Sequence, residues 1–223
     1  MDGNTFSLTY LAYMLHGAAW TVGLSALGFA GGGVLGFGIA LTRISRHRPL
    51  RWVSNIYVQL IQGTPLLILM FLSYFGLGLL GFDVPPLAAA GFAMTIYASA
   101  YLGEIWRAAL QAVPRAQWEA AECLALSSSQ RLFRVIVPQA LRIATPSTVG
   151  FLVQIVKNTS LASVVGFVEL VRAGQVINNT LYEPFLVFGV MALIYFALCY
   201  PLSRWSRSLE RKLQIGRRAC VQA

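Results

Sequence analysis

The polar residues that could handle a small solute stand at the edges of long apolar runs in this chain. Glu104 ends one such run, and Arg107 follows three residues later, a spacing at which two side chains can pair on one helix face. A carboxylate at membrane depth costs ~2.5–3.5 kcal/mol on insertion scales, so such a residue generally has a role. Two interpretations stay open. Glu104 faces a solute pathway and meets an amino group, or it forms a structural salt bridge at the membrane interface.

Two further polar groups fall at predicted helix breaks. The segment Lys157-Asn158-Thr159-Ser160 follows a short uncharged run, and polar groups at a broken helix are a common way to build a site near the membrane midplane. The segment Gln62-Gly63-Thr64-Pro65 lies within another run. Its proline frees a backbone carbonyl, which is tolerated at depth beside a cavity; an ordinary proline kink is the rival interpretation. The candidate pathway residues are Gln62, Thr64, Glu104, Lys157, Asn158, Thr159 and Ser160.

No residues of the chain form a recognisable catalytic or metal-binding pattern. His16 and His47 are far apart in the sequence, and the three cysteines form no C-x-x-C pair. No G-x-x-x-x-G-K-[ST] phosphate-binding loop occurs either. The sequence therefore predicts a protein that is not an enzyme and that binds no metal or cofactor itself. If ATP drives its function, another chain must hydrolyse that ATP.

The composition is that of an all-α integral membrane protein. Hydrophobic residues make up 57% of the chain and charged residues only 11%, against about a quarter charged in soluble domains. About 20 apolar residues in a helix cross the hydrocarbon core. Five such segments are predicted, the second with a bent exit near Gly76, Gly78 and Gly81, and the fourth short unless it extends through Lys157. They cover residues 17–42, 52–82, 84–103, 143–156 and 184–203.

The distribution of positive charge predicts an orientation. All but two of the 17 Lys and Arg residues fall in the first loop, in the region after the third segment and in the C-terminal tail. Five crossings place these three regions on one side, and Lys and Arg collect in cytoplasmic loops. The opposite side then carries Asp2, Asp83, Glu169 and Glu183. The N-terminus is thus expected outside and the C-terminus in the cytoplasm. The same sorting accounts for the net charge of +9 without nucleic-acid binding.

Gly28, Gly32 and Gly36 recur at a spacing of four within the first predicted span. Small residues at this spacing share one helix face and allow another helix to approach closely. The stripe predicts helix packing, either within one bundle or across a dimer.

The region after the third span predicts a short helix outside the membrane. Residues 117–126 are strong helix formers, and three serines, 127–129, interrupt the pattern before a second apolar stripe that ends at Pro138. From composition, this helix is either a docking element for a soluble partner or a solvated connector.

Several motifs in this chain resemble those of polar amino-acid permeases, the membrane subunits of ABC importers for histidine, arginine, glutamine, glutamate and opines. Glu119-Ala120-Ala121, closed by Ile136-Val137-Pro138, is similar to the EAA loop of these permeases. Ala125 stands where the pattern has glycine, a departure that bears on the turn after the helix. The resemblance extends over QGTPLLILMF, YLGEIWRAALQAVPRAQWEAAE and VKNTSLASVVGFVEL, and so over most of the chain.

The resemblance implies a type I ABC importer permease fold with one transmembrane domain, residues 1–213, containing a coupling loop at about 115–138. A basic cytoplasmic tail, 214–223, follows. It implies a dimer of ATPase subunits holding ATP and Mg, a second permease subunit (identical or paralogous), an extracytoplasmic solute-binding protein and a bacterial inner-membrane location. The alternative is a non-ABC channel or a secondary-carrier subunit, although no inverted repeat is visible. The residues implied in ATPase coupling are Glu119, Ala120, Ala121, Glu122, Leu124, Ala125 and Leu126.

Overall fold

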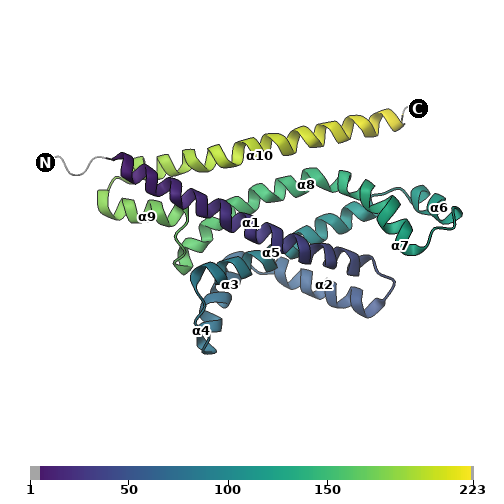
Figure 1. Cartoon of the computed structure of the whole chain (residues 1–223), viewed down its shortest axis with the longest axis horizontal. Helices are drawn as coiled ribbons and strands as arrows, with labels where there is room; N and C mark the ends of the chain where they lie inside the picture. The colour runs from purple at the N-terminus through teal and green to yellow at the C-terminus, as the bar shows by residue number, and fades with distance from the viewer. Residues whose placement is uncertain (1–5, 222–223) are drawn as a thin grey trace.

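The computed structural model describes residues 6–221, with side chains described as far as Leu213, and this part of the chain is helical without strands. Long helices lie roughly side by side along one axis (Figure 1). The basic tail predicted at 214–223 lies outside the described side chains. The elements are α1 (Leu8–Ile44), α2 (Arg48–Gly63), α3 (Leu66–Phe71), η1 (Leu72–Gly76), α4 (Leu77–Leu79), α5 (Pro86–Gln111), α6 (Arg115–Cys123), α7 (Ser128–Gln130), η2 (Arg131–Ile136), α8 (Val137–Asn158), η3 (Thr159–Val165), α9 (Leu170–Leu181) and α10 (Pro184–Val221).

Three continuous helical stretches in the described part are long and apolar enough to cross a membrane: Leu8–Ile44, Ser128–Val165 and Pro184–Leu213. The bent pair formed by α2 with α3–α4 raises that number to four. The predicted third span corresponds to α5, which is long enough but carries Thr95, Tyr97, Ser99 and Tyr101 within its apolar stretch. The all-helical membrane architecture is therefore observed, and composition and length alone identify three or four spans rather than five.

The second predicted span is broken within the segment Gln62–Pro65, one of the two places where the sequence predicted a bend. The chain turns by 101° between Gly63 and Leu66. Near the predicted exit at Gly76–Gly81, the chain passes through η1 and the helix ends at Leu79. Pro65 has no backbone N–H and forces the residue before it out of the helical region, and Thr64 is extended, with φ −107° and ψ 127°. The Thr64 hydroxyl donates to the Leu60 carbonyl at 2.7 Å, which satisfies an acceptor at the end of α2.

The fourth predicted span was too short. Residues 143–156 lie within a helical stretch that runs continuously from Ser128 to Val165, so the apolar stripe before Pro138 belongs to the same rod as the span. Pro138, which lacks a backbone N–H, stands where the π-helical turn η2 leads into the regular helix α8. Prolines thus shape both spans, one by breaking it and the other by beginning its regular part.

The glycine stripe of α1 packs within the chain, against α5. A Cβ added at Gly32 would lie 2.4 Å from the Ala98 Cβ, and one at Gly28 would lie 2.9 Å from the Met94 Cβ. A Cβ at Gly36 would meet the Ser99 carbonyl at 2.9 Å. Of the two packing partners left open by the sequence, the structure shows the one inside the bundle.

Three positively charged segments gather at one end of the molecule. The α1–α2 connection, the segment α6–η2 and the C-terminal part of α10 all lie at the right in Figure 1. Helix α9 and the first turns of α1 lie at the opposite end. We refer to the end that carries α6 as the α6 end.

Candidate functional site

The first candidate pathway residues meet in a cavity of about 410 Å³ between α2, α5 and α8, which we call the Glu104 pocket. Gln62, Tyr101, Glu104 and Ser147 contribute its polar lining. Helix α5 continues beyond Glu104 to Gln111. The Glu104 carboxylate therefore projects from within a helix, three turns of which share the cavity wall.

Two arginines engage the Glu104 carboxylate. Arg43 of α1 and Arg107 of α5 both form ion pairs with it, and Arg107 Nε donates to Oε2 at 3.0 Å. Arg43 Nε also donates to Asn55 Oδ1 of α2 at 2.9 Å. The side chain thus ties α1, α2 and α5 together, as the salt-bridge interpretation expects, while it also lines the cavity.

A second cavity, of about 630 Å³, lies between the end of α8 and α10, and we call it the Lys157 pocket. Lys157, Ser160, Tyr195 and Arg207 contribute to its lining. Within the described part of the chain, no hydrogen bond or ion pair occupies the Lys157 ammonium. The pocket therefore offers a positive, unpaired donor group beside an apolar wall.

The neighbours of Lys157 in the sequence have other contacts. Asn158 Oδ1 accepts a hydrogen bond from Gln154 Nε2 at 2.9 Å. Thr159 is fully buried, and its hydroxyl donates to the Val156 carbonyl at 2.8 Å. Neither these two residues nor Thr64 lines either pocket. The structure thus brings Gln62 to Glu104 and Ser160 to Lys157, and it keeps the two groups in separate cavities.

An aromatic cluster stiffens the wall of the Glu104 pocket. The rings of Tyr97 and Tyr101 in α5 are 4.5 Å apart, and Tyr101 stacks on Phe151 of α8 with centroids 5.5 Å apart. Such pairs add stability beyond the area that they bury. Sequence reasoning missed this cluster, although Tyr97 and Tyr101 are four residues apart and so share one helix face.

A buried carboxylate near the Lys157 pocket was also missed. Glu169, predicted among the charges of the outer side, is completely buried and caps α9 by accepting from the backbone N–H groups of Val171 and Arg172 at 3.0 and 2.9 Å. The Tyr195 hydroxyl of α10 donates to it at 3.0 Å, and the Thr21 hydroxyl of α1 donates at 3.4 Å. Glu169 therefore joins α1, α9 and α10 and orients Tyr195, a lining residue of the Lys157 pocket.

Helix α6 exposes one face and buries the other. Glu119 and Ala120 are exposed, and Leu124 is 74% exposed although it is apolar. Ala121 is buried, and Glu122 forms an ion pair with Arg131 of η2 at 2.9 Å. The end of α6 therefore presents an exposed leucine and an exposed carboxylate, while Ala121 and the ion pair to Arg131 attach the helix to the rest of the molecule.

The helix ends earlier than predicted, at Cys123 rather than Leu126. Ala125 adopts a left-handed conformation with φ 53°, and its N–H donates to the Glu122 carbonyl at 2.9 Å. The Leu126 N–H donates to the Ala121 carbonyl at 3.4 Å. These two hydrogen bonds form a Schellman motif, the helix ending in which glycine is preferred at the left-handed position. Alanine in place of the glycine of the EAA pattern therefore keeps the turn.

Ser127 then starts the next helix instead of only interrupting the first. Its hydroxyl accepts from the Gln130 N–H at 3.3 Å, and the Gln130 side chain accepts from the Ser127 N–H at 3.1 Å. This capping box begins the continuous helix that passes through η2 and α8 to Lys157. One continuous helix thus runs from the turn after α6 to the Lys157 pocket.

A helical membrane bundle with cavities on either side of α8 that contain polar side chains is the architecture of a transporter's membrane subunit. The chain belongs to the family of binding-protein-dependent transport system inner membrane components, which matches residues 32–215. It is a permease subunit of an ABC importer, and membership in this family excludes the channel and secondary-carrier alternatives.

Curated relatives and a solved structure agree over most of the chain. The L-cystine transport system permease protein TcyB of Bacillus subtilis is 37% identical over 198 residues, covering 88% of this chain and 85% of that protein. The arginine transport system permease protein ArtQ of the same organism is 32% identical, covering 93% and 95%. The crystal structure of an amino acid ABC transporter with histidines contains a chain that is 32% identical, with a TM-score of 0.86 and coverage of 93% of this chain and 99% of that one.

Proposed function

We propose that this chain forms the pathway for a polar amino acid, moved inward across a bacterial cytoplasmic membrane by ATP and Mg bound to separate ATPase subunits. A second permease subunit, identical or paralogous, and an extracytoplasmic solute-binding protein complete the proposed assembly. The relatives that transport L-cystine and arginine support the amino-acid class. The observation that carries the proposal is the unpaired Lys157 ammonium at the far end of the rod from α6.

Lys157 is the residue that we assign to the solute's α-carboxylate. Lys157 is exposed at the pocket, and an ammonium without a protein partner can form a charge-assisted hydrogen bond with an anionic ligand. The Glu104 carboxylate is less suited to bind the solute's amino group, because Arg43 and Arg107 already neutralise the charge of that carboxylate. Gln62, Glu104 and Ser160 remain proposed lining residues of the pathway, while Thr64, Asn158 and Thr159 are assigned to shaping the backbone around it.

The transport assay for this assignment compares the only two lysines of the sequence, one in the pocket and one on the exposed end of α10. Lys157→Gln is expected to reduce uptake of the radiolabelled amino acid by roughly 10- to 100-fold, the value of a hydrogen bond to a charged group. Lys212→Gln, the matched control, should leave uptake unchanged. Unimpaired uptake by Lys157→Gln, with the complex intact, contradicts the assignment.

The proposed topology has five crossings, with the N-terminus outside and the C-terminus in the cytoplasm. It is supported by the gathering of the three basic segments at the α6 end (Figure 1), since cytoplasmic loops carry the excess of Lys and Arg. A cytoplasm-dependent reporter fused after Arg218 should be active, and a periplasm-dependent reporter at the same position should be silent. The reverse pattern overturns this topology.

The exposed face of α6 is proposed to dock on the ATPase. Glu119, Ala120 and Leu124 are exposed, and the buried Ala121 packs the helix against the molecule. The Glu122 side chain positions the helix through its ion pair with Arg131. The backbone hydrogen bonds of Ala125 and Leu126 fix the turn that follows. Glu119→Arg is expected to abolish co-purification of the ATPase subunit and uptake together. Glu210→Arg, which changes the same charge on an exposed part of α10, is the control. Retained co-purification and uptake in Glu119→Arg would contradict the docking role.

A further inference from the structure

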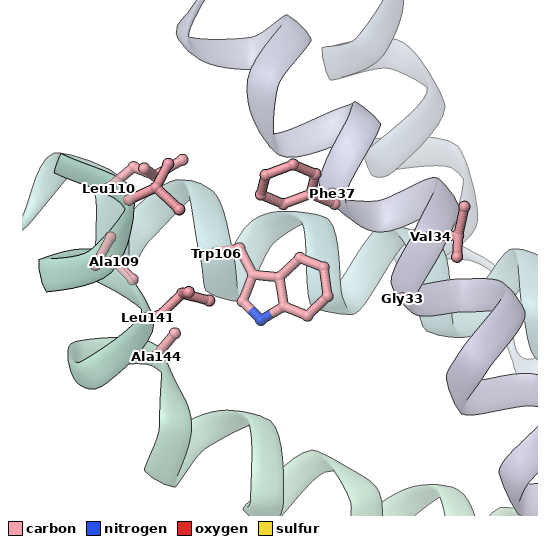
Figure 2. A pocket seen from close by; sticks show the side chains of 10 residues that line it. Gly33, Val34, Phe37, Trp106, Ala109, Leu110, Leu141 and Ala144 are labelled. Carbon is pink, nitrogen blue, oxygen red and sulfur yellow. The ribbon is translucent and has the colours of Figure 1, made fainter. Parts of the chain in front are cut away.

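An apolar pocket lies between α1, α5 and α8 and belongs to neither proposed pathway cavity. Its volume is about 380 Å³, and its lining is almost entirely carbon, from residues that include Gly33, Phe37, Trp106, Ala140, Leu141 and Ala144. In Figure 2 the Trp106 ring projects into the pocket, with Phe37 on one side and Leu141 and Ala144 on the other. Trp106 packs edge-on to Phe37 and donates from Nε1 to the Thr148 hydroxyl at 3.0 Å, so its orientation is fixed.

The pocket opens toward the outside of the bundle. Val34 and Leu141, on its rim, are 76% and 53% exposed. Trp106 and Glu104 are two residues apart on α5 and so point to different sides of that helix. A surface this apolar in a membrane-spanning bundle faces either lipid chains or another protein chain.

A positive charge stands at the α6 end of the pocket. Arg134 lies about one turn before Val137, a lining residue, in the same continuous helix. It is exposed, and within the described part of the chain its guanidinium has no hydrogen bond or ion pair. Phe133 beside it is 48% exposed. An apolar pocket with an exposed cation about one helical turn beyond its lining is complementary to an anionic amphiphile.

We propose that this pocket binds an acyl chain of an anionic phospholipid of the cytoplasmic leaflet, with the phosphate headgroup at Arg134. The leaflet assignment rests on the proposed topology. Because the pocket and the bilayer interior are similarly apolar, the transfer of an acyl chain from one to the other has a free energy close to zero. Selection for the lipid therefore comes from the headgroup, as basic groups between transmembrane helices bind anionic lipids on the cytoplasmic side.

Trp106 is the reporter for the test. The full chain, with Trp20, Trp52, Trp118 and Trp205 replaced by phenylalanine, is reconstituted into vesicles of phosphatidylglycerol and phosphatidylcholine in equal parts. Bromine is placed on the acyl chains of one lipid or the other, so surface charge is the same in both samples. Because bromine quenches tryptophan fluorescence on contact, brominated phosphatidylglycerol is expected to quench Trp106 more strongly. The assay requires no transport, so its outcome is independent of the proposed solute and ATPase.

Two variants and their controls make the test specific. Arg134→Gln should reduce the preference for phosphatidylglycerol about five-fold, the contribution of one cation near the membrane surface, while Arg211→Gln on exposed α10 should preserve it. Gly33→Leu should weaken quenching by both lipids, because a Cβ there points at Trp106 from 3.6 Å. Gly38→Leu, on the same helix with no neighbour within 4 Å, should not.

Equal quenching by the two lipids would mean that the pocket does not recognise the headgroup, and it overturns the proposal. Absence of quenching by either lipid would mean that a second copy of the chain covers the pocket, which overturns it as well.

Discussion

Arg131 of η2 holds Glu122 of α6 through an ion pair of 2.9 Å, with the arginine side chain largely buried and the glutamate 70% exposed. The pair connects the proposed docking helix to the rod that carries Lys157. An exposed pair of this kind contributes only about 0.2–1 kcal/mol, so its effect falls on the alignment of α6 more than on overall stability.

Glu122→Gln is therefore expected to retain the ATPase subunit and to reduce the amount of solute moved per ATP hydrolysed, by roughly two- to five-fold. Uptake and phosphate release, measured together in proteoliposomes, give this ratio. Glu122→Gln combined with Arg131→Gln should be no worse than Arg131→Gln alone if the two side chains act as a unit. Additive losses would show that Glu122 meets the ATPase directly.

Gly32→Ala should destabilise the protein strongly, because its new Cβ would lie 2.4 Å from the Ala98 Cβ and 3.0 Å from backbone atoms of α5. Overpacking of this kind costs typically 1–3 kcal/mol. Gly38→Ala has no neighbour within 4 Å and should be neutral or stabilising, since alanine favours a helix over glycine by roughly 0.5–1 kcal/mol. Thermal unfolding of both variants in detergent compares them, and equal midpoints would contradict the packing of α1 on α5.

Ala125→Gly should stabilise the turn after α6. A non-glycine residue in the left-handed region costs roughly 1–2 kcal/mol, and Ala125 has φ 53°. Ala125→Val, which adds β-branching at the same position, should shift the turn and weaken co-purification of the ATPase subunit. Hydrogen exchange at the Leu126 amide, which closes the Schellman motif, reports the change. Faster exchange in Ala125→Gly than in the unmodified chain would contradict the prediction that glycine stabilises this turn.

Glu169→Gln should destabilise the junction of α1, α9 and α10 by about 1–3 kcal/mol, because the amide group brings donors to a place already filled by the N–H and O–H donors that the carboxylate accepts. Tyr195→Phe removes one of those donors and should cost less, about 1 kcal/mol. Chemical unfolding monitored by circular dichroism ranks the two. A larger loss from Tyr195→Phe would show that the tyrosine hydroxyl, rather than the carboxylate's other hydrogen bonds, holds the junction.

The features that the sequence revealed are local ones. The EAA loop, the glycine stripe and the break at Thr64-Pro65 all depend on residues within a few positions of one another, and each has a helix-level physical cause. Membership in the permease family followed from the same motifs and is confirmed by the comparisons. The sequence did not reveal how strongly the chain turns at Pro65, because the angle depends on what α3 packs against.

Contacts between residues far apart in the sequence could not be predicted from these local patterns. Glu169 was predicted to lie on the outer side as a surface charge. Its partner Thr21 is 148 residues away, and no sequence pattern links the two. The sequence also left undecided which helix packs against the glycine stripe, because that helix comes from a distant segment of the chain. Helix α9 was missed because it is short and amphipathic, and its start depends on the buried Glu169 side chain.

The helix from Ser128 to Val165 touches α10 near its middle, where the Ser206 hydroxyl donates to the Pro146 carbonyl at 2.9 Å and both groups are buried. The contact continues toward Lys157, where Val153 and Val156 pack against Cys199 of α10. The two helices that form the wall of the Lys157 pocket are therefore attached to each other at Pro146 and again beside Lys157. Any movement of this helix at the pocket would carry α10 with it.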